Sequence, residues 1–209
     1  MSSVRLFIAV DFSDEVAAGA AAVAGQMRRT LEVPGTRITW VKPGNLHLTL
    51  KFLGDTDEEL VPEAIRALDA AADVHAAFTV RVRGAGGFPD LRRPSVLWLA
   101  LAEGGDRMVR LAGDVERALV GAGFPRDERT FTPHLTVGRV RIAGRGADFA
   151  AACARVDDRD AGACGIDRVT LYRSTLNPDG PAYTALRQCR LGGNKRNGTD
   201  QKGRPERRK

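Results

Sequence analysis

One short motif occurs twice in this chain of 209 residues and limits the folds open to it. The two copies, one in each half of the chain, are His47-Leu48-Thr49-Leu50 and His134-Leu135-Thr136-Val137. Successive side chains of a β-strand point to opposite faces, so each histidine shares a face with its threonine while the aliphatic residues face the other way. The repeat therefore predicts two half-buried strands, each with a histidine and a threonine on its open face.

The segments around the two copies predict a similar series of strands and helices. Apolar runs and alternating patterns predict strands at residues 5–10, 37–41, 45–53, 78–82, 96–101, 132–140, 167–176 and 183–191. Apolar residues at helical spacing predict helices at residues 13–31, from 62 to about 72, from 108 to a stop at 121–123, and a weak one at 149–155. This order predicts an α+β fold with two similar lobes of antiparallel sheet and outer helices, related by a pseudo-twofold axis around a central cleft.

Four local signals predict where these elements begin and end. Gly54-Asp55 predicts a turn after the first motif strand. The run Thr56-Asp57-Glu58-Glu59 spells a helix capping box, although Pro62 places the start of the regular helix later. Glycines in residues 83–89 predict a loop, and Asn177-Pro178-Asp179-Gly180 predicts the tight turn of a hairpin.

The composition is that of an ordinary globular protein, with 43% hydrophobic and 28% charged residues. The early apolar run Leu6–Val10 is too short for a signal peptide or a membrane span, so we expect a cytoplasmic protein that does not bind membranes. The three cysteines form no Cys-x-x-Cys pair, which predicts neither a disulfide framework nor a zinc site. We expect a monomer with no metal and no cofactor.

The net charge of +6 is concentrated at the carboxyl end of the chain. Residues 192–209 hold seven basic and two acidic residues, which leaves a net charge of only +1 on residues 1–191. This terminal segment is rich in glycine and polar residues and has no apolar periodicity. We therefore predict one two-lobed domain at residues 1–191, followed by a basic, disordered tail at residues 192–209.

The paired histidines suit acid–base chemistry on a phosphate diester. Because the pKa of histidine is ordinarily about 6.5, one ring can be neutral while the other is protonated at the same pH. A base and an acid on opposite sides of one phosphorus atom require this combination. The threonine hydroxyls beside them can donate hydrogen bonds to phosphate oxygens. A single such histidine is more often a satisfied strand residue, and the duplication is what favours a functional site.

Four stretches of the sequence, two of which contain the motifs, carry a resemblance to a known family. They are Arg5–Val10, Asn45–Gly54, Val96–Leu99 and Phe131–Arg139. In order and spacing, residues 4–190 resemble the two-histidine phosphoesterase superfamily, and within it the RNA 2′,3′-cyclic phosphodiesterases historically called 2′-5′ RNA ligases. Gly138 occupies a place where many relatives have alanine, a change that should not disturb the site.

The resemblance implies metal-independent hydrolysis of a 2′,3′-cyclic phosphate, on an RNA end or a nucleotide, to a 2′-phosphomonoester. It implies that His134 accepts a proton from water and that His47 donates one to the departing ribose 3′ oxygen, roles that chain order alone does not assign. Thr49, Thr136 and Arg139 would bind the phosphate. Strict alternation places Arg139 opposite the histidine face, so its participation requires a bulge or strand end just before it.

Other residues near the motifs have weaker claims to a role. Lys51 shares the expected open face of the first motif and could meet the phosphate backbone or simply be solvated. Trp40, Phe88 and Tyr183 could stack on a base, although core packing is the commoner role for such residues. His75 has no motif around it and is expected at the surface near a helix end.

The residues alone leave three other functions open. A nucleotide- or RNA-binding module would keep the site without turnover, but binding by itself needs no acid and base. A metallohydrolase would use the histidines as ligands, but neither motif has the adjacent acidic residue found in patterns such as His-Glu-x-x-His. A related enzyme could join RNA ends as a 2′-5′ RNA ligase or hydrolyse a small cyclic phosphate.

Overall fold

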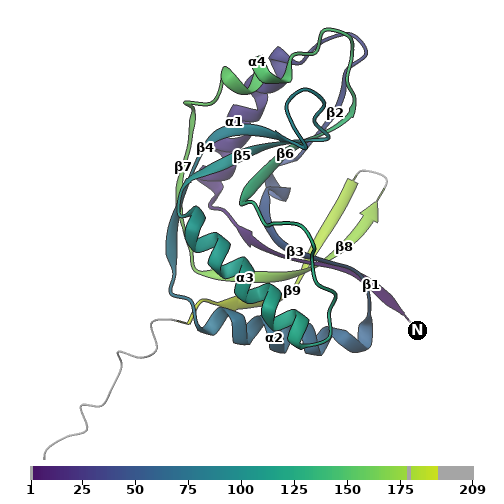
Figure 1. Cartoon of the computed structure of the whole chain (residues 1–209), viewed down its shortest axis with the longest axis vertical. Coiled ribbons are helices and arrows are strands. Elements are labelled where there is room, and N and C mark those ends of the chain that lie inside the picture. Colours follow the sequence, from purple (N-terminus) through teal and green to yellow (C-terminus); the bar gives the residue numbers. More distant parts are fainter. Residues whose placement is uncertain (1, 178–179, 193–209) are drawn as a thin grey trace, which may run out of the picture.

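The computed structural model describes residues 2–177 and 180–192, which form two antiparallel β-sheets with helices packed against them (Figure 1). The strands are β1 Ser3–Asp11, β2 Arg37–Trp40, β3 His47–Asp57, β4 Phe78–Phe88, β5 Val96–Glu103, β6 His134–Ile142, β7 Asp160–Ile166, β8 Arg168–Asn177 and β9 Gly180–Arg190. The helices are α1 Asp14–Thr30, α2 Val61–Asp73, α3 Gly105–Gly121 and α4 Phe149–Ala154, with 3₁₀ helices η1 Pro43–Asn45 and η2 Glu58–Leu60.

The two motifs lie in different sheets. The first sheet has the strand order β3-β1-β8-β9, and the second has the order β2-β6-β5-β4-β7. The motif strands β3 and β6 approach each other in the middle of the molecule, where the two sheets meet (Figure 1). The predicted α+β fold with two lobes of antiparallel sheet is confirmed.

Each lobe takes its elements from both halves of the chain. β4 follows the first motif in sequence but pairs with β5 in the second sheet, and β8 follows the second motif but pairs with β1 in the first. The helices cross over as well: α2 and α3 contribute to the core behind the first sheet, and α1 and α4 to the core behind the second. Neither half of the sequence therefore contains a complete lobe.

The sequence of α1 explains where this helix begins and which face it buries. The side chain of Ser13 accepts a hydrogen bond from the backbone N–H of Val16 at 3.4 Å, as a helix N-cap does. Acidic residues in the first turn and arginines in the last turn complement the helix dipole. Its buried face, spaced by three or four residues, consists of Val16, Ala20, Val23 and Met27.

The first motif strand is longer than predicted, and the expected turn at Gly54-Asp55 is wrong. β3 continues to Asp57 because β1 extends beside it as far as Ser3, which pairs with Asp57. Gly54 has a φ of 71° and lies next to an irregularity in the β1–β3 register. The glycine therefore serves a bulge inside the strand, where a positive φ is needed, and does not reverse the chain.

The predicted capping box at residues 56–59 is also wrong. The hydroxyl of Thr56 donates to the carbonyl of Gly54 at 3.3 Å instead of accepting a helix N–H. A 3₁₀ turn follows the strand, and α2 begins at Val61 with no side-chain cap and with Pro62 in its first turn. The helix start predicted from the proline is confirmed, because proline needs no hydrogen-bonding partner there.

The glycine-rich loop predicted at residues 83–89 is a strand as far as Phe88, and β7 was not predicted at all. Within this stretch, residues 85–88 pair with β5, and Arg83 pairs with Asp160 of β7. Gly86 is needed there because a Cβ atom would come within 2.3 Å of the Trp98 ring. β7 consists largely of glycine, alanine and cysteine, so it shows no alternation of bulky and polar side chains.

The remaining predictions concern the carboxyl end and the cysteines. β8 and β9 form the predicted hairpin, whereas residues 178–179 of its turn and residues 193–209 of the proposed tail lie outside the described residues. Cys153 and Cys189 are buried and Cys164 is half-buried, all as free thiols. In the described part of the chain, no helix is long and apolar enough to span a membrane.

Candidate active site

Both motif histidines are held by the same local hydrogen bond. His47 and His134 are the first residues of β3 and β6. The ring Nδ1 of His47 lies 2.8 Å from the carbonyl oxygen of Asn45, and the ring Nδ1 of His134 lies 2.7 Å from that of Thr132. Because a carbonyl only accepts, Nδ1–H is the donor in each ring. Nε2 is therefore the atom of each ring left to take up or release a proton.

The motif threonines lie on the same faces as the histidines, as the alternation predicts. Leu48 and Leu135 are fully buried, whereas Thr49, Thr136 and both histidines are half-buried. The helices cover the opposite face of each sheet, where the aliphatic motif residues join the two cores. Each histidine and its threonine therefore lie on the face of the sheet that the helices leave uncovered.

A β-bulge follows each motif threonine and changes which face the next residues occupy. In β3 the pairing register shifts between Thr49 and Lys51, and in β6 it shifts between Thr136 and Gly138. Lys51 and Gly138 are consequently buried on the core side. The residue after each of them returns to the face of the histidine.

The second bulge places Arg139 on the face of the histidines. A bulge or strand end just before this residue was the requirement for its participation. Its charge acts on the rings of both His47 and His134, so the arginine lies near both of them. The equivalent position after the first bulge holds Phe52, whose residue surface is 58% exposed. The two copies therefore differ here, with a cation in one and an aromatic ring in the other.

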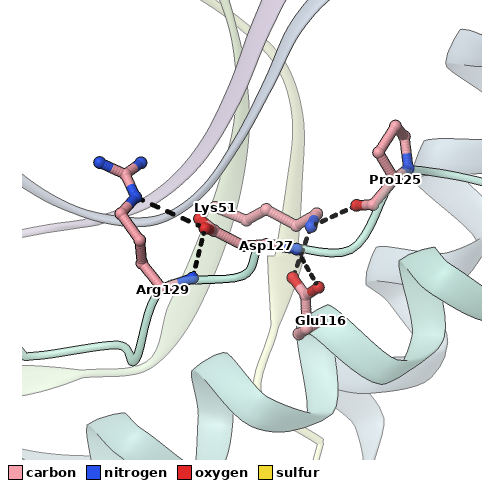
Figure 2. Close-up of polar contacts among 5 residues, drawn as sticks. All are labelled: Lys51, Glu116, Pro125, Asp127 and Arg129. Atoms are coloured by element: carbon pink, nitrogen blue, oxygen red, sulfur yellow. Dashed lines mark hydrogen bonds and ion pairs between the residues drawn. The ribbon is translucent and has the colours of Figure 1, made fainter.

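The expected position of Lys51 on the open face is wrong. Its side chain is only 3% exposed, and its ammonium group lies against Glu116 of α3, behind the first sheet (Figure 2). The bulge is the physical reason, because one extra residue reverses the alternation on which the expectation rested.

Burial is the largest influence on the pKa of both histidines and lowers each pKa below the ordinary value of 6.5. The hydrogen bond from each ring to the backbone raises the pKa, and the charge of Arg139 lowers it. Only His47 has a further influence, the carboxylate of Asp11, which raises its pKa. The two rings are thus alike in geometry but differ in the charges around them.

Asp11 was not identified from the sequence. It is the last residue of β1 and pairs directly with the first motif histidine. Its carboxylate accepts hydrogen bonds from the hydroxyls of Thr170 at 3.2 Å and Tyr172 at 2.8 Å, both on β8. The equivalent position beside the second motif histidine is Ala100. The polar residue that ends the apolar run of β1 was the available signal, but its meaning depends on which strand pairs with β1.

Aromatic rings lie against both histidines. The ring of His47 is 4.9 Å from that of Phe7 and 5.2 Å from that of Tyr183, measured between centroids. The ring of His134 is 4.9 Å from that of Phe88, in an edge-to-face arrangement. Of the three aromatic residues singled out in the sequence, Phe88 and Tyr183 therefore lie at the site.

Trp40 takes the commoner role of core packing, whereas Trp98 lies near the site. Trp40 packs on the core side of the second sheet, where a Cβ atom on Gly138 would lie 3.2 Å from its ring. Trp98, which the sequence marked only as part of a buried strand, lies 6.3 Å from the ring of His134. Its buried indole N–H has no hydrogen-bond partner among the described residues.

His75 lies apart from the two motifs, two residues after the end of α2, as predicted. Its Nε2 is 2.8 Å from a carboxylate oxygen of Asp114 on α3. The side chain is only 16% exposed, so the expectation of a surface residue was too simple. A structural contact between the end of α2 and α3 accounts for this histidine.

Two cavities lie away from the motifs. One, of about 670 Å³, lies between the end of α1, β2 and Arg141, and the other, of about 560 Å³, lies around the start of α3. No motif residue lines either of them. Within the described residues, no group of three His, Cys, Asp or Glu side chains is arranged to hold a metal ion.

Comparisons with known proteins agree with the resemblance seen in the sequence. A sequence model described as the 2'-5' RNA ligase superfamily matches residues 14–178. The RNA 2',3'-cyclic phosphodiesterase of Thermotoga maritima is 33% identical over 191 residues, which cover 90% of this chain and 96% of that protein.

Two crystal structures share the fold over nearly their whole length. A protein of Thermus thermophilus has a TM-score of 0.73 and 31% identity, and E. coli LigT complexed with 3'-AMP has a TM-score of 0.64 and 25% identity. Each comparison covers 91% of this chain and 99% of the other. The chain is a member of the 2'-5' RNA ligase superfamily, the family of two-histidine phosphoesterases that its repeated motif indicated.

Proposed function

We propose that this protein hydrolyses the 2′,3′-cyclic phosphate at RNA ends to a 2′-phosphomonoester, without a metal ion. One observation carries the proposal: two histidines with the same backbone hydrogen bond, each with Nε2 left for proton transfer, lie near a single arginine that acts on both. This is the arrangement that an acid, a base and a phosphate anion between them require.

The reaction needs one proton transfer at each histidine. Neutral His134 takes a proton from water through Nε2, and the water oxygen forms a bond to phosphorus. The bond between phosphorus and the ribose 3′ oxygen breaks, and protonated His47 donates its Nε2 proton to that oxygen. The 2′ oxygen keeps the phosphate. Exchange of one proton with solvent at each ring restores the starting state.

Asp11 supports this assignment of the two roles. A carboxylate near an imidazole stabilises the protonated form, and only His47 has one in the paired position. Burial and Arg139 favour the neutral form of both rings, but His134 has Ala100 in the paired position and no carboxylate that opposes them. The difference in charge between the two motif copies therefore favours His47 as the acid and His134 as the base.

Three further residues would stabilise the negative charge on the phosphate. Thr49 and Thr136 each present a hydroxyl beside a histidine, and Arg139 brings a guanidinium group to the same faces. Hydrogen bonds and positive charge directed at the nonbridging oxygens are worth most in the transition state, where charge on them increases.

The relatives support the choice of substrate. Curated proteins about one third identical to this chain are named RNA 2',3'-cyclic phosphodiesterase, and LigT has been crystallised with 3'-AMP. A ribonucleotide with its phosphate on the ribose therefore occupies one relative with the same fold. We take RNA ends and nucleotides that bear a 2′,3′-cyclic phosphate as the substrates, and a monomer in the cytoplasm as the working state.

The decisive experiment is a product analysis. Purified protein is incubated with a short oligonucleotide ending in a 2′,3′-cyclic phosphate, in excess chelator, and the product isomer is identified by ³¹P NMR. We expect a 2′-phosphate and an undiminished rate. Binding without turnover would support the binding module, rate loss reversed by a divalent metal would support a metallohydrolase, and joined RNA ends would support a ligase. A 3′-phosphate would reverse the assignment of the leaving oxygen.

A further inference from the structure

A largely buried ion pair joins the strand of the first motif to α3, and both of its side chains contact the segment that leads into the second motif. The ammonium group of Lys51 lies 2.5 Å from a carboxylate oxygen of Glu116 on α3. It also donates a hydrogen bond to the carbonyl of Pro125 at 2.8 Å. Figure 2 shows both contacts converging on the lysine, whose side chain is only 3% exposed.

The glutamate extends this connection along the segment. Its second carboxylate oxygen accepts the backbone N–H of Asp127 at 2.8 Å, so one side chain contacts both the lysine and the segment (Figure 2). The carboxylate of Asp127 in turn accepts the backbone N–H of Arg129 at 3.1 Å. Residues 125–133 belong to neither a helix nor a strand, so such contacts matter for their position.

This segment determines the surroundings of His134. It ends at Pro133, and the carbonyl of Thr132 is the acceptor that holds the ring Nδ1 of the histidine. Phe131 packs against the core behind the first sheet, while His134 begins β6 in the second. Any displacement of the segment therefore moves the one hydrogen bond that sets the tautomer and direction of this ring.

The ion pair belongs to only one of the two motif copies. The position equivalent to Lys51 after the second bulge is Gly138, which lies against Ile38 and Trp40. Burying the lysine and most of the glutamate, whose side chain is 23% exposed, is also costly, and apolar side chains of similar size often stabilise a protein at least as well. Stability alone is thus a weak reason for a lysine and a glutamate at this place.

We propose that Lys51 and Glu116 are positioning residues for His134, fixing the segment at residues 125–133 so that the Thr132 carbonyl meets the ring. The inference rests on the proposed function for its effect on turnover. The pair acts from the strand of the first motif on the ring of the second. It therefore also sets where the two histidines lie relative to each other.

The first test removes both charges together. The double variant Lys51→Met with Glu116→Leu leaves no unpaired buried charge but releases Pro125 and Asp127. We expect thermal unfolding near the wild-type temperature, a kcat ten- to a hundredfold lower and a KM within about threefold, because misplaced groups lose mainly rate. Arg187→Met, which breaks an exposed contact with Asp69 elsewhere in the first lobe, is the control and should keep its kcat. A stable double variant with wild-type kcat would overturn the proposal.

A second test needs neither activity nor a change in the ion pair. Asp127→Pro removes both the carboxylate and the N–H that Glu116 holds, whereas Asp127→Ala removes the carboxylate and keeps the N–H, so the two variants differ in the contact with Glu116. The ¹⁵N shifts of the ring nitrogens report the tautomer of each histidine in the free protein. We expect His134 to lose its preference for Nδ1–H in the proline variant alone, with His47 unchanged. Identical His134 spectra in both variants would contradict a positioning role, and an inactive wild type with the expected spectra would count against the proposed function only.

Discussion

At the scale of single residues, the site is two copies of one histidine environment distinguished by their neighbours. Both rings donate Nδ1–H to a carbonyl two residues earlier in the chain. Asp11 is present beside one ring and absent beside the other, and Arg139 follows one motif only. In the proposed mechanism, a symmetric pair of strands therefore performs an asymmetric reaction, because different charges would set the acid and the base.

Replacing either motif histidine should abolish most of the activity while leaving the fold in place. We expect His47→Ala and His134→Ala each to lower kcat by about 10² to 10⁴, since each removes one proton-transfer group. Both side chains are half-buried on helix-free faces, so thermal unfolding should change little. His75→Ala, which breaks the contact with Asp114, is the matched control and should keep its kcat. Wild-type turnover in either motif variant would rule out the paired mechanism.

Removing the charge of Asp11 should shift one side of the pH profile. In the proposed mechanism the rate depends on neutral His134 and protonated His47, so kcat/KM should be bell-shaped with two apparent pKa values. The carboxylate raises the pKa of His47, so Asp11→Asn should lower it and move the alkaline decline to lower pH. The acid side should stay in place. Asp69→Asn, on the far side of the first lobe, serves as control; a shift of the acid side instead would reverse the roles.

At this scale, the sequence predicted the role of a residue wherever that role depends only on neighbouring positions in the chain. The two motifs and Arg139 were found because strand alternation and resemblance need only neighbouring positions. Asp11 and Phe7 were missed because their importance comes from pairing between β1 and distant strands. Lys51 was placed on the wrong face because a bulge adds one residue to the alternation. No residue type in that stretch predicts the bulge.

At the scale of strands, the two bulges decide which side chains lie on the face of the histidines. The bulge in β6 turns Gly138 toward the core and Arg139 toward the histidines. Without it, the arginine would point into an apolar layer, where an unpaired charge is very unfavourable. The irregularity is thus part of the site and not a defect of the strand.

Changing the size of the residue at position 138 should test whether the bulge in β6 positions Arg139. A Cβ atom there would lie 3.1 Å from Ile38 and 3.2 Å from Trp40, both half-buried on the edge strand β2. Gly138→Ala should need only a small shift and keep kcat within about twofold. Gly138→Leu should push β2 away and reduce kcat at least tenfold through Arg139. The double variant Gly138→Leu with Arg139→Ala would show whether the leucine acts through Arg139. If it does, the losses of kcat in the two single variants should not add in the double variant. Full activity of the leucine variant would contradict it.

Strand ends were the least predictable part of the fold, for a shared reason. β3 extends through Gly54, which pairs with Leu6, and β4 extends through Gly86, which pairs with Trp98, because neighbouring strands supply partners there. Local sequence favours turns at such glycines, and tertiary pairing overrides that preference. β7 was missed for the same reason, since only its position beside β4 makes it a strand.

At the scale of the whole molecule, the exchange of strands makes the two lobes depend on each other. The first sheet needs β8 from the second half of the chain, and the second sheet needs β4 from the first half. The sequence predicted two lobes from the repeated order of elements. It did not predict the exchange, because local patterns do not show which sheet a strand joins.

Cutting the chain between β4 and β5 should therefore unfold both pieces. We expect fragments 1–90 and 91–209, each alone, to show no cooperative thermal transition by circular dichroism, because each lacks a central strand of its own sheet. Mixed together, they should recover a transition and measurable turnover. Intact protein with a protease site inserted after Asp90 is the control. A cooperative transition in either isolated fragment would contradict the interdependence of the lobes.

The repeated passage of the chain between the lobes also limits how the molecule can move. β1 leads to α1 on the other lobe, α2 leads to β4, β5 leads to α3, and β7 leads back to β8. A hinge that opened the lobes widely would have to stretch all of these connections at once. We expect the spacing between the two imidazole rings to be set by the rigid scaffold before substrate arrives. Selection among phosphate groups would then depend on their fit to a fixed gap and not on closure around them.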